Sequence, residues 1–188
     1  MVKHIPQSFK TEKQAERYLE NILKPHFRLL SQCKLLHLET GQPLRIDYLA
    51  RPLANCNYQF DVFGIEVKRG GYTIANSQYN KPLWQAVDYT HCKINDDRAN
   101  SFNGKRLERV YLFPGLDGED CRTVWGVNRI VGIGHVGTIL IRPAYPLGSY
   151  PAFYMCDTRQ WCPIQGPHAG GHKTTQKLGS GVKRDDDI

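Results

Sequence analysis

The sequence predicts a domain of the α/β (α+β) class in which helices pack on one sheet. A helical segment is followed by three strand-like segments with no helix between them, and then by a second helix and a further strand. Strands that follow one another directly favour an antiparallel meander, and a strand reached through a helical crossover can join the same sheet. The chain has 188 residues, which is enough for one sizeable core and short for two.

The first helix is predicted over Thr11–Leu30, where apolar residues recur at spacings of three and four. Thr11 or Ser8 can cap its start, and Pro25 is expected to bend or end it. Three acids four residues apart form a stripe beside the apolar face: Glu12, Glu16 and Glu20. The stripe can simply be solvated, or Glu16, the acid best held against the core, can lend its carboxylate to a site on the sheet.

Three strands are predicted next, over Cys33–Leu38, Leu44–Leu53 and Tyr58–Arg69, with a turn at residues 39–43 between the first two. Alternation in the second strand predicts one apolar row, from which Asp47 faces away. That row consists of Leu44, Ile46, Tyr48 and Ala50.

The third predicted strand carries an acid and a lysine on one face. Glu66 and Lys68 alternate with Ile65 and Val67, so the two charged side chains lie above an apolar row. Desolvating this pair is unfavourable unless a metal ion, a water or a phosphate meets it. The alternative is an ion pair on an exposed edge that contributes about 0 to 1 kcal/mol. Asp61, five residues before Glu66, should face the opposite side of the strand.

The second helix is predicted over Lys81–Ile94, with Gln85 and Tyr89 on one face. Arg109–Phe113 is a compact strand, and Val124–Ile141 holds two further strand-like runs. At Arg142 the composition changes. We therefore divide the chain into a core domain, residues 1–141, and a basic, Pro- and Gly-rich, β-rich C-terminal extension, residues 142–188, whose end is expected to be mobile.

The chain is basic, with 25 Lys and Arg residues against 18 Asp and Glu residues and a formal net charge of +7. Such an excess favours a polyanionic partner such as nucleic acid, although many basic proteins have none. No apolar run approaches the roughly 20 residues that cross a bilayer, and Met1–Lys10 has no signal-peptide core. We expect a soluble cytoplasmic protein without a membrane partner, with its scattered cysteines reduced.

The order of these elements and residues resembles the PD-(D/E)XK nuclease superfamily, whose restriction-endonuclease-like core is a helix, three antiparallel strands, a helix and another strand. The resemblance covers roughly Thr11–Pro114. It implies that Asp47 is the first metal-binding acid and that Glu66 and Lys68 are the E-x-K pair. Arg45-Ile46-Asp47 lacks the proline that gives the motif its first letter.

The resemblance also assigns residues on the two helices. Glu16 is similar to the acid that many members carry on the first helix. Gln85 and Tyr89 are similar to the Gln and Tyr found on the second helix of several branches. Glu16 would then bind a second metal or orient a water, and Gln85 would position Lys68 or a DNA phosphate.

The chemistry of these residues suits phosphodiester hydrolysis. Mg²⁺ prefers oxygen ligands, so the carboxylates of Asp47 and Glu66 and the carbonyl of Val67 can hold it, with Mn²⁺ as a substitute. Lys68 would orient or help deprotonate the attacking water and offset charge on the phosphate. The prediction is a metal-dependent DNA endonuclease, either junction-resolving or of a phage or mobile-element (homing) type.

The partner is predicted to be DNA, and a homodimer is expected if both strands are cut. Phosphate contacts are predicted for Arg45, Arg69, Lys81 and Tyr89. The alternative function is a nuclease-fold binding module without catalysis, such as a phage-encoded inhibitor that binds nucleic acid or a host protein. The intact acid and lysine set weighs against this alternative.

A second cluster of metal-type residues lies near the end of the chain. It consists of Cys156, Cys162, His168 and His172. These residue types bind Zn²⁺, but their spacing departs from compact zinc fingers and several Gly and Pro residues interrupt the segment. Chance composition is the favoured explanation, and a Zn²⁺ site is the alternative.

Overall fold

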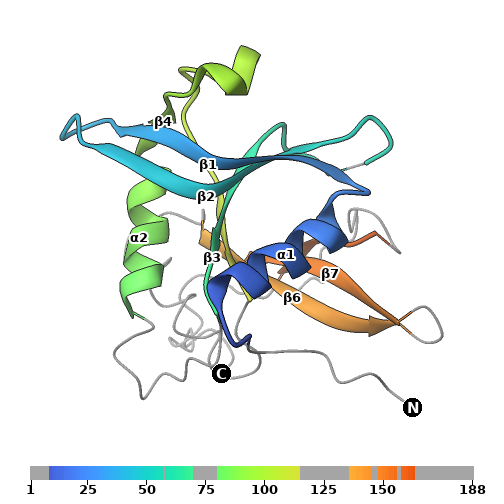
Figure 1. The fold of residues 1–188 in the computed structure, drawn as a ribbon. Coiled ribbons are helices and arrows are strands. Elements are labelled where there is room, and N and C mark those ends of the chain that lie inside the picture. The colour runs from blue at the N-terminus through green and yellow to red at the C-terminus, as the bar shows by residue number, and fades with distance from the viewer. Residues whose placement is uncertain are drawn as a thin grey trace, which may run out of the picture.

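The computed structural model of the protein describes residues 9–56, 58–69, 80–114, 136–144, 148–155 and 158–163 (Figure 1). Its strands form one sheet in the order β4-β1-β2-β3-β5-β6-β7-β8. The strands are β1 (Phe27–His37), β2 (Pro43–Pro52), β3 (Phe63–Val67), β4 (Cys92–Ile94), β5 (Val110–Phe113), β6 (Val136–Ala144), β7 (Gly148–Met155) and β8 (Thr158–Trp161).

The sheet is mixed. Neighbours from β4 through β1 and β2 to β3 are antiparallel, β3, β5 and β6 run parallel, and β6, β7 and β8 are antiparallel again. The α2 helix (Asn80–Thr90) lies in the connection between the parallel strands β3 and β5. Helices with a mixed sheet confirm the predicted α/β class.

The two α-helices contribute to separate apolar clusters on the two faces of the sheet (Figure 1). The α1 helix (Glu12–Leu23) is capped by Thr11, whose side chain accepts a hydrogen bond from the Gln14 N–H at 3.2 Å. The cluster that contains α1, the α1-side core, is formed by Ala15, Leu19, Leu23, Phe27, Phe63, Ile65, Val67, Tyr111, Phe113, Phe153 and their neighbours. The cluster that contains α2, the α2-side core, is formed by Leu83, Ala86, Tyr89, Cys33, Leu35, Ile46, Leu107, Val110 and their neighbours.

Two predicted helix boundaries are wrong. The first helix ends at Leu23 rather than Leu30, because Pro25 follows at once and the chain from Phe27 pairs with β2. The second helix ends at Thr90, since Cys92–Ile94 pairs with the end of β1 to form β4. In both places strand pairing overrides a local helical pattern.

The third strand is shorter than predicted, because β3 covers only Phe63–Val67. Of the predicted runs in Val124–Ile141, the part from Val136 is β6, and residues 124–135 lie outside the described residues. The β6 strand crosses the predicted domain boundary after Ile141, and β7 and β8 continue the same sheet. Phe153 of β7 is fully buried in the α1-side core. The described part of the C-terminal extension therefore shares the core of the domain.

The apolar residues of β1 and β2 change from one face of the sheet to the other at Gln32. Phe27 lies in the α1-side core and Cys33 in the α2-side core, although they are six positions apart, an even spacing that would place both on the same face of a regular strand. On β2, Ile46 lies in the α2-side core and Tyr48 in the α1-side core. Gln32 adopts the left-handed backbone conformation, with φ 51°. The prediction that four alternate residues share one face is therefore wrong for Leu44, Ile46, Tyr48 and Ala50.

The pairing register does not change at this position. Ser31 pairs with Tyr48, and Cys33 pairs with Ile46. No residue is inserted, so Gln32 and Asp47 lie opposite each other at the point where both strands change face.

No helix among the described residues is long and apolar enough to span a bilayer. Four cysteines in the described residues have free thiols: Cys33, Cys56, Cys92 and Cys162.

Candidate active site

Asp47, Glu66 and Lys68 come together where β3 ends. The paired residues of β2 and β3 run from Ala50 and Phe63 to Tyr48 and Ile65. Beyond the last pair, the Val67 N–H donates a hydrogen bond to Asp47 Oδ2 at 2.8 Å. A side-chain carboxylate thus serves as the acceptor for a strand N–H, and this bond holds Asp47 beside the E-x-K segment.

Glu66 is buried and its charge is paired with Lys68. The Glu66 residue is 2% exposed, and Lys68 Nζ lies 2.5 Å from Glu66 Oε1. Because β3 is central in the sheet, the interpretation of this pair as a surface ion pair on an exposed edge is wrong. The two partners differ in exposure, with the Lys68 side chain 21% exposed and the Glu66 side chain 3% exposed, so loss of Lys68 would leave a buried carboxylate uncompensated while loss of Glu66 would leave an ammonium that solvent can reach.

The pKa of Glu66 is raised to about 7, chiefly by burial and then by the negative charge of the nearby Asp47 carboxylate, while the Lys68 ammonium opposes both effects. Burial alone would lower the pKa of Lys68, but the Glu66 carboxylate outweighs it and the net shift is upward. Two carboxylates therefore lie close together, one buried and one half-buried, and one ammonium is paired with the buried one. An additional positive charge nearby would stabilise the ionised form of both carboxylates.

Glu16 is the α1 acid whose charge acts on Asp47, and Glu12, also on α1, acts on Lys68. Burial raises the pKa of Glu16, and the negative charge of Asp47 adds to the shift. Glu20, one turn later, accepts hydrogen bonds from the Tyr48 hydroxyl at 2.9 Å and from Lys24 Nζ at 2.8 Å. The two acids therefore differ. Glu20 is hydrogen-bonded to Tyr48 of β2, whereas Glu16 lies near enough to Asp47 for the two negative charges to repel each other.

Gln85 and Tyr89 approach the site from α2. The Gln85 side-chain amide donates to Tyr89 Oη at 2.6 Å, and Tyr89 Oη donates to the Arg45 carbonyl at 2.7 Å. Burial raises the pKa of Tyr89, and the Glu66 carboxylate adds to the shift. Gln85 therefore contacts Tyr89, which in turn lies near Glu66. Its predicted direct contact with Lys68 is not among the hydrogen bonds of the described residues.

The predicted DNA contacts fall into two groups. Arg45, Arg69 and Lys81 are exposed, as a phosphate contact requires. Tyr89 is 2% exposed and its hydroxyl is bonded inside the protein, so its burial argues against the predicted contact with DNA. Trp84, on the same helix, is 49% exposed.

The donor set can hold a divalent cation. Among the described residues no three His, Cys, Asp or Glu side chains form a cluster. The proposed ligands are fewer and of mixed type: the Asp47 and Glu66 carboxylates and the Val67 carbonyl between them. Oxygen ligands of this kind, completed by waters and a substrate phosphate, match the preference of Mg²⁺. The raised pKa of Glu66 supports the fit, since a cation would relieve the repulsion between the carboxylates.

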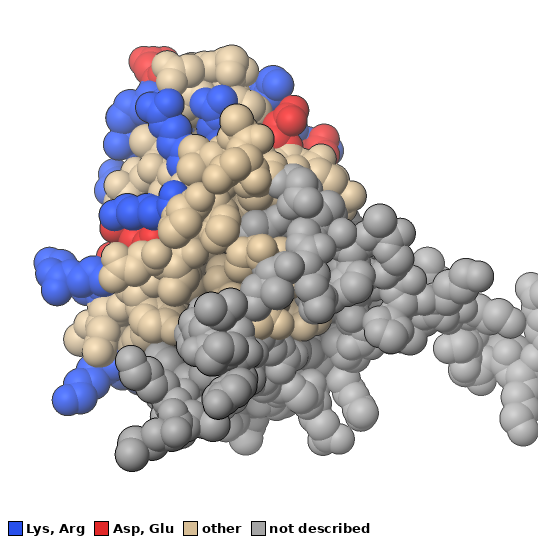
Figure 2. All heavy atoms as spheres, turned by 90° about the vertical axis from the view of Figure 1, so that its right-hand side faces the viewer, with Lys and Arg blue, Asp and Glu red and all other residues tan. Residues whose placement is uncertain are grey.

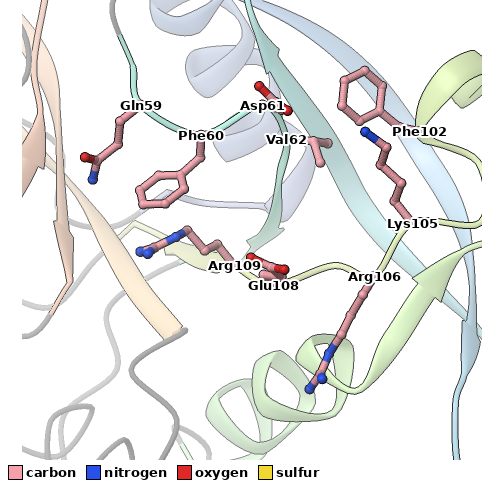
Figure 3. Close-up of a pocket in the computed structure, with 9 residues that line it drawn as sticks. All are labelled: Gln59, Phe60, Asp61, Val62, Phe102, Lys105, Arg106, Glu108 and Arg109. Atoms are coloured by element: carbon pink, nitrogen blue, oxygen red, sulfur yellow. The ribbon is translucent and has the colours of Figure 1, made fainter.

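A cavity of about 440 Å³ lies away from this site, between the segments that lead into β3 and β5 (Figure 3). None of the predicted catalytic residues lines it. The Arg109 guanidinium lies 3.4 Å from the centroid of the Phe60 ring, and Lys105 Nζ lies 4.8 Å from that of Phe102. Asp61, predicted to lie on the same strand as Glu66 but on its opposite side, is an exposed residue of this cavity and precedes β3.

Of the four predicted zinc residues, one lies within the described part of the chain. Cys162 is fully buried, and Cys156, His168 and His172 lie outside the described residues.

Gln32 is a contact of the site that the sequence did not indicate. Its side-chain amide donates to Asp47 Oδ1 at 3.2 Å. On β1 the apolar odd-numbered positions are interrupted at Ser31 and resume with the same parity at Cys33, so the periodicity does not show a change of face. Register alone could have found it, since Gln32 lies opposite Asp47 once the hairpin is correctly paired.

No family model, curated protein or solved structure matches this chain.

Proposed function

We propose that this protein is a metal-dependent DNA endonuclease with a restriction-endonuclease-like core, related to the PD-(D/E)XK nucleases. The observation that carries the proposal is the convergence of Asp47, Glu66 and Lys68, from two strands, at the end of β3. The element order supports it as well: α1, the antiparallel strands β1 to β3, α2, and β5 parallel to β3.

The resident cofactor is proposed to be Mg²⁺, held by Asp47, Glu66 and the Val67 carbonyl. When bound, it supplies Lewis-acid activation of a water and neutralisation of phosphate charge. The protein's own groups do the rest. Lys68, tied to Glu66 at 2.5 Å, presents an ammonium to the phosphate and can orient the attacking water. Tyr89 lies close enough to Glu66 to feel its charge, and Gln85 donates a hydrogen bond to the Tyr89 hydroxyl.

A DNA partner is supported by the distribution of charge. Figure 2 shows Lys and Arg side chains along the left-hand edge of the described surface, with few Asp or Glu side chains among them. The cavity of Figure 3 adds Lys105, Arg106 and Arg109, and no ion pair within the described residues joins them to Asp61 or Glu108. Cations without acidic partners are suited to phosphate contacts.

The test is a cleavage assay with Mg²⁺ or Mn²⁺ on linear duplex, single-stranded, flap and four-way-junction DNA. Asp47→Asn, Glu66→Gln and Lys68→Gln should each reduce the rate by on the order of 10²-fold or more, because each removes a charge that acts on the reacting phosphate. Asp61→Asn and Asp88→Asn are matched controls, since both acids are exposed and lie outside the site. Thermal unfolding of each variant confirms that it is folded.

Equal cutting by wild type and Glu66→Gln, in preparations free of contaminating nuclease, would remove the assignment. Absence of cutting on every substrate, together with tight binding to a protein, would favour the binding module that lacks catalysis. The substrate panel also separates a junction-resolving enzyme from one that cuts linear duplex.

A further inference from the structure

Gln32 combines two unusual features at one residue. It is a non-glycine residue with φ 51°, a conformation that side chains with a Cβ rarely adopt. Its amide nitrogen donates to Asp47 Oδ1 at 3.2 Å across the β1–β2 hairpin. Residues held in strained backbone conformations cluster at functional sites, because the surrounding structure must enforce them.

The two oxygens of Asp47 have different donors. Oδ1 accepts from the Gln32 side chain, and Oδ2 accepts from the Val67 N–H at 2.8 Å. A carboxylate oxygen has two lone pairs, so each oxygen keeps one acceptor site for a ligand. The two bonds together fix both the position and the rotation of the carboxylate.

The backbone of Gln32 is held by a separate clamp. Arg98 Nη2 donates to the Gln32 carbonyl at 3.1 Å and to Asp96 Oδ2 at 2.7 Å, and Arg98 Nε donates to Asp96 Oδ1 at 2.9 Å. Asp96 is 5% exposed and also accepts from the Lys34 N–H at 3.1 Å. Asp96 is the N-cap of the 3₁₀ helix η2 (Asp97–Phe102), and Arg98 is in its first turn. Their hydrogen bonds reach the backbone of β1 at Gln32 and at Lys34, on either side of Cys33.

We propose that Gln32 is a positioning residue of the active site, held in its left-handed conformation by the Asp96–Arg98 pair so that its amide fixes the Asp47 carboxylate for a divalent cation. The cation part of this inference rests on the proposed function. Outer hydrogen bonds to metal-binding carboxylates orient them, and their loss typically weakens metal affinity by about 10- to 100-fold.

The decisive variant is Gln32→Gly. Glycine adopts φ 51° without strain, so the fold is expected to remain intact while the amide is lost. Hydrogen exchange of the Val67 N–H, followed by NMR in the metal-free full chain, should become faster because its acceptor Asp47 is no longer fixed. The Mn²⁺ dissociation constant, measured by titration with Mn²⁺ alone, should rise about 10-fold. Thermal unfolding should change little, which separates positioning from a general structural role.

Ser31→Gly is the matched control, because it makes the same backbone change one residue away and leaves the Asp47 contact in place. It should leave Val67 exchange and Mn²⁺ affinity as in the wild type. Gln32→Asn is the second variant, since asparagine also tolerates this conformation but is one methylene too short to reach Asp47. It should behave as Gln32→Gly does.

Unchanged Val67 exchange in both Gln32 variants would overturn the inference. Faster Val67 exchange in a protein whose wild type binds no Mn²⁺ would leave the positioning role standing and would remove the metal site. The two proposals can therefore fail separately.

Discussion

At the scale of single residues, Glu66 occupies a place where a carboxylate is unfavourable without a cation. It is 2% exposed, it faces Asp47, and only the Lys68 ammonium offsets the charge. A folded protein could fill this position with an apolar residue at no loss of stability. A buried acid of this kind is a candidate ligand or catalytic group, and this is the reason Glu66 stands at the centre of the proposed function.

This environment predicts a pH dependence of stability. The pKa of Glu66 is about 7 in the folded protein and about 4.5 when unperturbed, so the neutral acid is the form that favours folding. Its contribution is present in full below about pH 4.5 and is lost as the pH rises through 7. Glu66→Gln should therefore stabilise the metal-free protein at pH 8 by on the order of 1 to 3 kcal/mol and have little effect at pH 4.5.

Urea unfolding in EDTA at pH 4.5, 6 and 8 measures this difference. Asp61→Asn, a substitution of the same kind at an exposed acid, should give a profile parallel to that of the wild type. If Glu66→Gln also ran parallel to the wild type between pH 4.5 and 8, the carboxylate would be ionised and satisfied without a metal. The assignment of Glu66 as a metal ligand would then lose its electrostatic support.

At the scale of elements, the spacing of apolar residues along the sequence was enough to predict individual helices and strands. The spacing of Ala15 and Leu19 predicted α1, and the run before Pro114 predicted β5. The parity of Glu66 and Lys68 correctly placed both on one face, as their ion pair confirms. The grouping of Asp47 with the Glu66 and Lys68 segment came from the family resemblance, and the hydrogen bond from the Val67 N–H to Asp47 brings them together in the structure.

Other features could not follow from periodicity. One part of β1 and β2 packs in the α1-side core and the other in the α2-side core, so apolar residues at every second position fit either face, and the same parity resumes after the change of face at Gln32 and Asp47. The short strand β4 forms because Cys92–Ile94 meets the end of β1, a contact between distant segments. The role of Tyr89 depends on burial that its helix position alone did not reveal.

The strands β6 and β7 provide a test of whether the C-terminal part supports the core. A Cβ on Gly137 would collide with the Tyr154 carbonyl oxygen and would lie 2.6 Å from the Tyr111 ring. Gly137→Ala should destabilise the protein by about 1 to 3 kcal/mol, because the backbone obstacle cannot rotate away. Chemical denaturation measures the loss.

Gly64→Ala is the comparison. There the Cβ would meet the Cδ1 end of the Ile46 side chain, which can adopt another rotamer, so the loss should be smaller. An equal or smaller loss for Gly137→Ala would mean that β6 and β7 separate from β5 without disturbing the folded core.

At the scale of the whole molecule, the site and the cavity lie at opposite ends of β3. Lys68 follows the last residue of the strand, and Asp61 and Val62 precede its first residue. At a rise of about 3.3 Å per residue, these ends are roughly 20 Å apart, a distance that one duplex can span. A duplex cut beside Glu66 could therefore also be held at the cavity, which would fix its direction on the protein.

The cations over Phe102 test this arrangement. The Arg51 guanidinium carbon lies 4.1 Å from the centroid of that ring, and Lys105 approaches the same ring. In the Glu66→Gln background with EDTA, the double substitution Arg51→Gln and Lys105→Gln should weaken duplex binding. It should also lower the slope of log affinity against log salt by nearly 2, since each lost phosphate contact contributes about 0.9.

The matched control is the double substitution Lys13→Gln and Lys24→Gln on α1, which removes the same net charge from exposed positions. Non-specific attraction to the basic protein would lower binding equally in both doubles, and the salt slopes would agree. A phosphate contact at the cavity predicts a larger drop in slope for the Arg51 and Lys105 double alone. Equal slopes would confine the DNA-binding surface to the surroundings of Asp47 and Glu66 and exclude the cavity from it.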